Sequence, residues 1–152
     1  ATSLAPNDLG LFKERGVVYF LSGKLDQAME DLEVVRARPL TGPGQNNDLL
    51  TLYYLGRTYQ EKGELSKALP LFLKVKKGAS FFIDVHLNLG SVYGRMDQKG
   101  MSHFYFGKYF KLRRDEKNAI LHFKKAIEWL DKGSPEWEEA RSEVKELTQK
   151  KS

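Results

Sequence analysis

The chain has 152 residues, of which 41% are hydrophobic and 30% charged, and it contains no cysteine. The absence of cysteine excludes disulfides, thiolate metal sites and cysteine nucleophiles, and apolar runs of only a few residues exclude a transmembrane helix. The net charge of +5 comes from basic residues interleaved with acidic ones, as on solvated helix faces, so the chain is expected to form one soluble domain with a core of its own.

Two segments in the first half of the chain, about 9–38 and 49–77, repeat each other at a distance of 40 residues (56 − 16). Each is predicted to form two helices joined by a tight turn, in which a glycine supplies the permissive backbone. The stretch between them, "RPLTGPGQNND", predicts a loop with ordered ends and a mobile middle, because it is rich in proline and glycine. The matched positions are Gly16, Tyr19, Gly23, Ala28, Leu32 and Val35 against Gly56, Tyr59, Gly63, Ala68, Phe72 and Val75.

A third copy, about 83–113, and a fourth, about 102–130, share one helix. Gly90 of the third copy stands in the same context as Gly56, and Asp97 stands where the turn glycine is expected. The next helix carries Ser102 and Phe106 in the register of a second helix. It also carries Gly107 and Phe110 in the register of a first helix, so we predict that it serves both roles.

The last predicted helix covers 134–150. Ser134 is a suitable N-cap, Pro135 a suitable first helical residue, and acidic residues follow in the first turn, where they complement the helix dipole. A narrow apolar stripe that includes Trp137 and Leu147 predicts a helix that covers the open end of the repeat stack.

This pattern of a small residue and a tyrosine on the first helix, a turn glycine, and alanines with an aromatic on the second resembles the tetratricopeptide repeat (TPR) family over about residues 9–130. The resemblance implies an all-α, right-handed superhelix of about eight antiparallel helices with a C-terminal capping helix. We therefore expect a single solenoid domain over residues 1–152. TPR domains are protein-interaction modules that hold a partner segment in a concave groove lined by the first helices.

Residues 85–127, with "LGSVYGR", "SHFYFGKYF" and "AILHFKKAI", also resemble the C-terminal TPR domain of bacterial periplasmic zinc metalloproteases of peptidase family M forty-eight. This resemblance implies a covalently linked upstream HExxH protease domain, for which the chain would recruit substrates or partners. The first residues lack an initiating methionine and an export signal, so an excised domain or a processed product is expected. The expected location is the periplasm if the resemblance holds and the cytoplasm otherwise.

No motif indicates catalysis by this chain. A P-loop, an HExxH motif and a Ser/His/Asp pattern are all absent from the sequence, and the three histidines, His86, His103 and His122, are expected to pack in or beside the core. We therefore expect no enzyme activity, no metal and no cofactor.

A protein or peptide ligand is the expected partner. The carboxylate clamp of chaperone-binding TPRs is not reproduced, because Lys13 is followed by Val17 and Leu87 by Ser91. A stand-alone scaffold or adaptor, including a self-associating one, stays open as an alternative. No nucleic-acid partner is expected. A nucleic-acid-binding helical repeat is favoured only by a pI near 9.3 and the basic run from Lys108 to Arg114, and the acidic Asp115 and Glu116 follow this run at once. The predicted groove residues are Lys13, Tyr53, Arg57, Gln60, Leu87, Ser91, Phe104 and Lys108, with Val17, Asp84 and Lys111 beside them.

Overall fold

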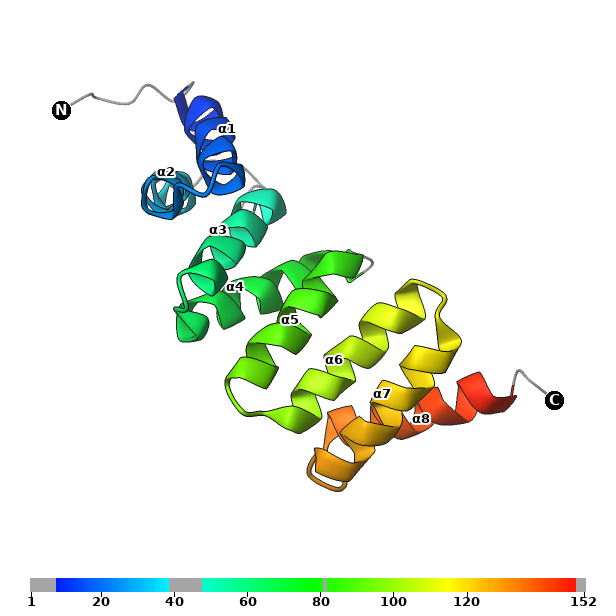
Figure 1. Ribbon diagram of the computed structural model, residues 1–152. Coiled ribbons are helices and arrows are strands. Elements are labelled where there is room, and N and C mark those ends of the chain that lie inside the picture. Colours follow the sequence, from blue (N-terminus) through cyan, green and yellow to red (C-terminus); the bar gives the residue numbers. More distant parts are fainter. Residues whose placement is uncertain (1–7, 39–47, 81, 150–152) are drawn as a thin grey trace. The chain divides into compact units, whose positions relative to one another are not determined.

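The computed structural model describes residues 8–38, 48–80 and 82–149 (Figure 1). Within these ranges the chain forms eight α-helices and no strand, as expected for an all-α repeat fold. None of the described helices has the length and apolar character needed to cross a membrane. The middle of the predicted loop, 39–47, and the last residue of the predicted final helix lie outside the described residues. The helices are α1 (Asp8–Leu21), α2 (Leu25–Ala37), α3 (Leu49–Glu61), α4 (Leu65–Gly78), α5 (Ile83–Arg95), α6 (Lys99–Leu112), α7 (Glu116–Trp129) and α8 (Pro135–Gln149).

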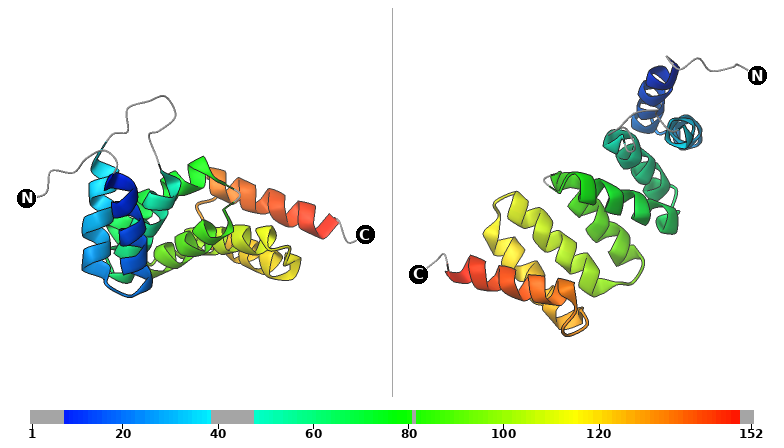
Figure 2. Two further views of the ribbon diagram at one scale, coloured as in Figure 1. Left: turned by 90° about the horizontal axis from the view of Figure 1, so that it is seen from above. Right: turned by 180° about the vertical axis from the view of Figure 1, so that it is seen from behind.

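The chain divides into two compact units, Ala1–Ala79 and Ser80–Ser152. In the first unit α1 packs on α2, α3 packs on α4, and α3 also contacts both α2 and α1. In the second unit α6 lies between α5 and α7, and α8 packs on α7 and touches α6 (Figure 2). The single solenoid over the whole chain stays a prediction.

Each helix pair is held together by a glycine on its first helix and a large side chain 16 residues later. A Cβ on Gly56 would lie 2.8 Å from the Phe72 ring, and a Cβ on Gly16 would lie 2.8 Å from Leu32. Both large residues are fully buried. The glycine therefore lets the two helix backbones approach until the side chain of one packs on the backbone of the other.

The shared helix of the third and fourth copies makes both of the predicted contacts. Gly90 of α5 faces Phe106 of α6, and Gly107 of the same α6 faces Phe123 of α7, each with 2.7 Å from a Cβ at the glycine to the ring. Ser102 lies in the small-residue position and donates a 2.7 Å hydrogen bond to the carbonyl of Gly90. Thus α6 is the second helix of one pair and the first helix of the next.

The turns between paired helices use left-handed backbone at one fixed position, seven residues after the packing glycine. Gly23 and Gly63 adopt φ of 77° and 79° there, as predicted for glycine, which has no Cβ to oppose a positive φ. Asp97 and Arg114 occupy the same position in the second unit with φ of 58° and 61°. The repeat register therefore fixes the turn geometry even where the residue is not glycine.

Local side chains define where several helices begin. The carboxylate of Asp48 accepts hydrogen bonds from the backbone N–H groups of Leu50 and Thr51 and caps α3. The hydroxyl of Ser134 accepts one from the N–H of Trp137 (3.2 Å) at the start of α8. Trp137, Ala140 and Leu147 then bury one face of α8, which makes it the capping helix of the second unit.

Candidate partner-binding surfaces

The first candidate surface lies on α1 and α3 and is centred on Arg57. The guanidinium carbon of Arg57 lies 5.1 Å from the ring centroid of Phe20 and 5.9 Å from that of Tyr53, and Nη1 donates to the Tyr53 hydroxyl at 3.2 Å. Tyr54 packs edge-on against Phe20 with ring centroids 5.5 Å apart. The side chain of Arg57 is thus fixed between two helices while 31% of it stays exposed.

The side chain of Lys13, on α1, contacts the residue that caps the start of α3. Its ammonium pairs with the Asp48 carboxylate at 2.5 Å. Burial alone would raise the pKa of Asp48, but the hydrogen bonds from Lys13 and Thr51 outweigh it and hold that pKa below its ordinary value. Lys13 therefore supports the N-cap of α3.

The structure places the predicted groove residues in three different environments. Tyr53, Gln60 and Phe104 are buried, so their side chains offer little surface to a partner. Sequence periodicity assigned them to the first-helix face, but that face turns partly into the neighbouring helices. Leu87 is exposed on α5, and Ser91 is half-buried one turn later. The binding role of all eight predicted residues stays a prediction.

Two basic residues of α6, Lys108 and Lys111, form ion pairs within the second unit. Lys108 binds Glu139 at 2.9 Å and Lys111 binds Glu143 at 2.6 Å, both on α8. These ion pairs neutralise part of the basic run that would favour nucleic acid. They also show that α8 occupies the side of α6 that was expected to add to the groove edge.

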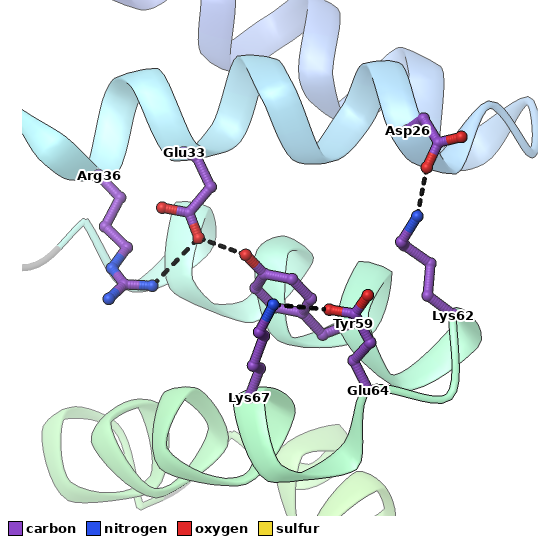
Figure 3. Close-up of polar contacts among 7 residues, drawn as sticks. All are labelled: Asp26, Glu33, Arg36, Tyr59, Lys62, Glu64 and Lys67. Carbon is purple, nitrogen blue, oxygen red and sulfur yellow. Dashed lines mark hydrogen bonds and ion pairs between the residues drawn. The ribbon is translucent and has the colours of Figure 1, made fainter.

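A second face of the first unit was not anticipated from the sequence. The hydroxyl of Tyr59 on α3 donates to the carboxylate of Glu33 on α2 at 2.6 Å, and Arg36 donates to the same oxygen at 3.2 Å (Figure 3). Burial, and then this hydrogen bond to Glu33, raise the pKa of Tyr59 to about 12. A cleft of about 390 Å³ lies beside them and is lined partly by Lys67 and Lys74.

Two of the three histidines form a contact that sequence spacing did not predict. His103 on α6 and His122 on α7 lie with their Nδ1 atoms 3.0 Å apart, at the length of a hydrogen bond. The ring of Phe110 stacks on that of His122, with the ring centroids 5.3 Å apart and an angle of 9° between the ring planes. Burial lowers the pKa of both histidines. The charge of His103 and then that of Lys125 lower the pKa of His122 further, and Lys125 also lowers that of His103. The repeat alignment of the sequence could have indicated this pair. It places Gly107 in contact with the following helix, and the contact of Gly107 with Phe123 sets His122 opposite the aromatic face of α6.

His86 packs as the sequence predicted. It is buried, stacks on Tyr105 with ring centroids 6.1 Å apart, and its Nε2 lies 2.9 Å from the carbonyl oxygen of Ser80. In the part of the chain that the structure describes, no group of three or more His, Cys, Asp or Glu side chains could hold a metal ion.

Comparison with known proteins finds resemblance only among solved structures. No family model and no curated protein matches the chain. A crystal structure of MamA superposes with a TM-score of 0.63 at 19% sequence identity, covering 96% of this chain and 80% of that one. The structure of MamA AMB-1 superposes with a TM-score of 0.62 at 20% identity, covering 93% of this chain and 72% of that one. A tetratricopeptide repeat protein from Parabacteroides merdae gives 0.60 at 16% identity, covering 95% of this chain and 61% of that one. The fold is therefore of the tetratricopeptide repeat type. At these sequence identities, the similarity shows the fold alone.

Proposed function

We propose that the chain is a non-catalytic protein-binding module that holds a peptide or segment of a partner on its first helices. The observation that carries the proposal is the fixed position of Arg57 between Phe20 and Tyr53. Arginine and tyrosine are the residue types enriched at binding hot spots, and an arginine already held in place loses less side-chain entropy on binding. TPR architecture favours the same role, although fold likeness is a weaker argument than a site.

The partner segment is proposed to lie along α1 and α3, over Phe20, Tyr54 and Arg57. On the second unit the proposed contacts are Leu87 and Ser91 on α5, because Lys108 is already paired with Glu139 and Phe104 is buried. The partner should offer an acceptor to the Arg57 guanidinium and an apolar side chain to the exposed edges of Phe20 and Tyr54.

Peptide selection followed by a titration tests the proposal. Peptides selected from a random phage library on the intact chain are labelled, and their Kd is measured by fluorescence anisotropy. Arg57→Ala is expected to raise Kd at least tenfold, which corresponds to about 1.4 kcal/mol, and to leave the melting temperature within a few degrees. Lys77→Ala, on an exposed lysine of α4 outside both candidate surfaces, is the matched control and should bind like the natural chain. Equal binding by the Arg57 and Lys77 variants would reject this surface.

Tyr53 is not suited to the same test. Because its ring is buried, Tyr53→Ala is expected to cost about 3 kcal/mol of stability, so a loss of binding there would not separate contact from unfolding. Tyr53→Phe keeps the ring and removes only the oxygen that accepts from Arg57. It should weaken peptide binding less than Arg57→Ala does.

We infer a more specific role from the sequence resemblance of residues 85–127 alone: a recruiting domain attached to a zinc metalloprotease. No family model or curated match supports it. The test is to sequence the natural reading frame upstream of Ala1. An HExxH motif in that frame would support the role, and an unrelated domain or an immediate start codon would leave the general protein-binding module.

A further inference from the structure

Two large apolar side chains on one side of α1 are exposed to water. Leu11 and Val18 are 64% and 61% exposed, and they lie seven residues apart, two turns along the same face of the helix. Leu21, which is also exposed, extends this row toward the end of α1. Single exposed leucines are ordinary on protein surfaces, but a row on one helix face marks an interaction site.

The internal repeat shows what covers this face one repeat later. At the distance of 40 residues, Leu11 corresponds to Thr51 and Val18 to Thr58 of α3, which are 2% and 0% exposed. Between them Leu55, the counterpart of Arg15, is fully buried as well. The same helix face is therefore covered on α3 and open on α1.

The first repeat covers this face of α3. Tyr59 lies on the same side of α3 as Leu55 and binds Glu33 of α2, and Lys62, the residue after α3, binds Asp26 of α2 (Figure 3). Tyr54, on the other flank of this side, packs on Phe20 of α1. The positions between these contacts thus face the preceding repeat, and α2 is the helix that binds along them.

The polar contact of this interface also has an unused counterpart on α1. Tyr19 corresponds to Tyr59, and its hydroxyl makes no hydrogen bond with any residue that the structure describes, whereas that of Tyr59 donates to Glu33 at 2.6 Å. Arg15, between Leu11 and Val18 in sequence, pairs with Asp31 of α2 at 2.7 Å, and its guanidinium carbon lies 5.7 Å from the ring centroid of Tyr19. The face formed by Leu11, Val18 and Tyr19, here called the α1 face, therefore has the apolar and polar elements of a repeat interface.

We propose that the α1 face binds the second helix of a further, preceding tetratricopeptide repeat, packed on α1 as α2 packs on α3. The occupant would place an apolar stripe over Leu11 and Val18 and a carboxylate on the hydroxyl of Tyr19. A repeat in series is chosen over a second copy because the α1 face continues, in the same register, the interface that α2 and α3 already form. The first described repeat then acts as an internal member of a longer array.

A chain with one extra repeat tests the proposal directly. Residues 1–47 are placed before residues 8–152, so that a copy of α2 precedes α1 by the natural connection and Asp8 takes the place of Asp48. Stability in repeat arrays depends on interfaces between neighbours, so a matching interface raises it. Unfolding in urea is monitored by the helical circular dichroism signal. We expect a single transition with a midpoint above that of the natural chain.

Substitutions at the junction provide the controls. Val18→Glu in the second copy of α1 should remove the gain in the extended chain, while the same change in the natural chain should leave its midpoint unchanged because Val18 is exposed. Tyr19→Phe at the junction should lose part of the gain and also be neutral in the natural chain. Leu121→Glu, on an exposed leucine of α7, is the matched control and should reduce neither midpoint.

The contrary outcomes are distinct. A separate, unshifted transition for residues 8–152 in the extended chain would overturn the proposal. So would a natural chain that is dimeric by light scattering and becomes monomeric with Val18→Glu, since a second copy would then occupy the α1 face.

Discussion

The ring of Phe123 lies so close to Gly107 that a Cβ on this glycine would be 2.7 Å from two of its ring carbons. Phe123 is fully buried, so its ring has no free space to move into. Gly107→Ala is therefore expected to destabilise the chain by about 1 kcal/mol in urea unfolding, because overpacking outweighs the helix propensity of alanine. Gly107→Leu should cost more.

Gly10 provides the control for this prediction. It also lies in a helix, but a Cβ there would meet nothing within 4 Å. Gly10→Ala should leave stability unchanged or raise it by up to about 1 kcal/mol. If Gly107→Ala were as harmless as Gly10→Ala, the close approach of α6 and α7 would be wrong.

Arg114 stores backbone strain that a substitution can release. Its φ of 61° lies in the left-handed region, which costs a residue other than glycine about 1 kcal/mol. Arg114→Gly is expected to raise the free energy of unfolding by about 0.5–1 kcal/mol, the remainder being lost to the flexibility of glycine in the unfolded chain. The thermal midpoint of the variant measures the gain.

The reverse change at the equivalent turn checks the reason. Gly23 has a φ of 77° and no atom near its Cβ position, so Gly23→Ala adds backbone strain without a clash. It should lower stability by about 1 kcal/mol. A stabilised Gly23→Ala variant would contradict the strain argument for Arg114 as well.

The repeated features of the fold were predictable from the sequence, and the contacts made once were not. Gly107 could be assigned to a helix contact because Gly16 and Gly56 have the same surroundings, and a repeat imposes the same packing each time. The burial of Tyr53 and the pairing of Lys108 with Glu139 depend on which neighbouring helix covers each face. The periodicity of the sequence does not indicate which helix covers which face, so the candidate surface was predicted only in part.

The Tyr59–Glu33 hydrogen bond is expected to stabilise the contact between α2 and α3. Tyr59→Phe removes the donor at 2.6 Å but leaves Glu33 paired with Arg36, so the loss should be about 1–2 kcal/mol. Tyr19→Phe is the matched control, since this tyrosine has no such bond among the described residues, and it should cost almost nothing. The free energy of unfolding of both variants is measured in urea. Equal losses of stability in the two variants would mean that the hydroxyl of Tyr59 contributes little.

The His103–His122 pair predicts how stability depends on pH. With both rings neutral, one Nδ1–H donates to the other Nδ1 at 3.0 Å, whereas two protonated rings would direct N–H against N–H. Burial and Lys125 lower both pKa values below the ordinary 6.5, while Glu128 opposes this at His103. Because the unfolded chain then binds more protons than the folded one, the stability from this pair is complete above about pH 7 and is lost as the pH falls past 6.5 toward the lower folded pKa values.

The measurement is the urea midpoint at several pH values between 8 and 3, for the natural chain and for a His103→Gln, His122→Phe variant. The natural chain should lose stability between about pH 7 and pH 5, and the variant should be flat there. Both should lose stability below about pH 4, because the pKa values of Asp48 and Asp115 are lowered in the folded state and these carboxylates must be protonated. A natural chain that stays flat down to pH 5, or a variant as sensitive as the natural chain, would exclude the histidine pair as the source.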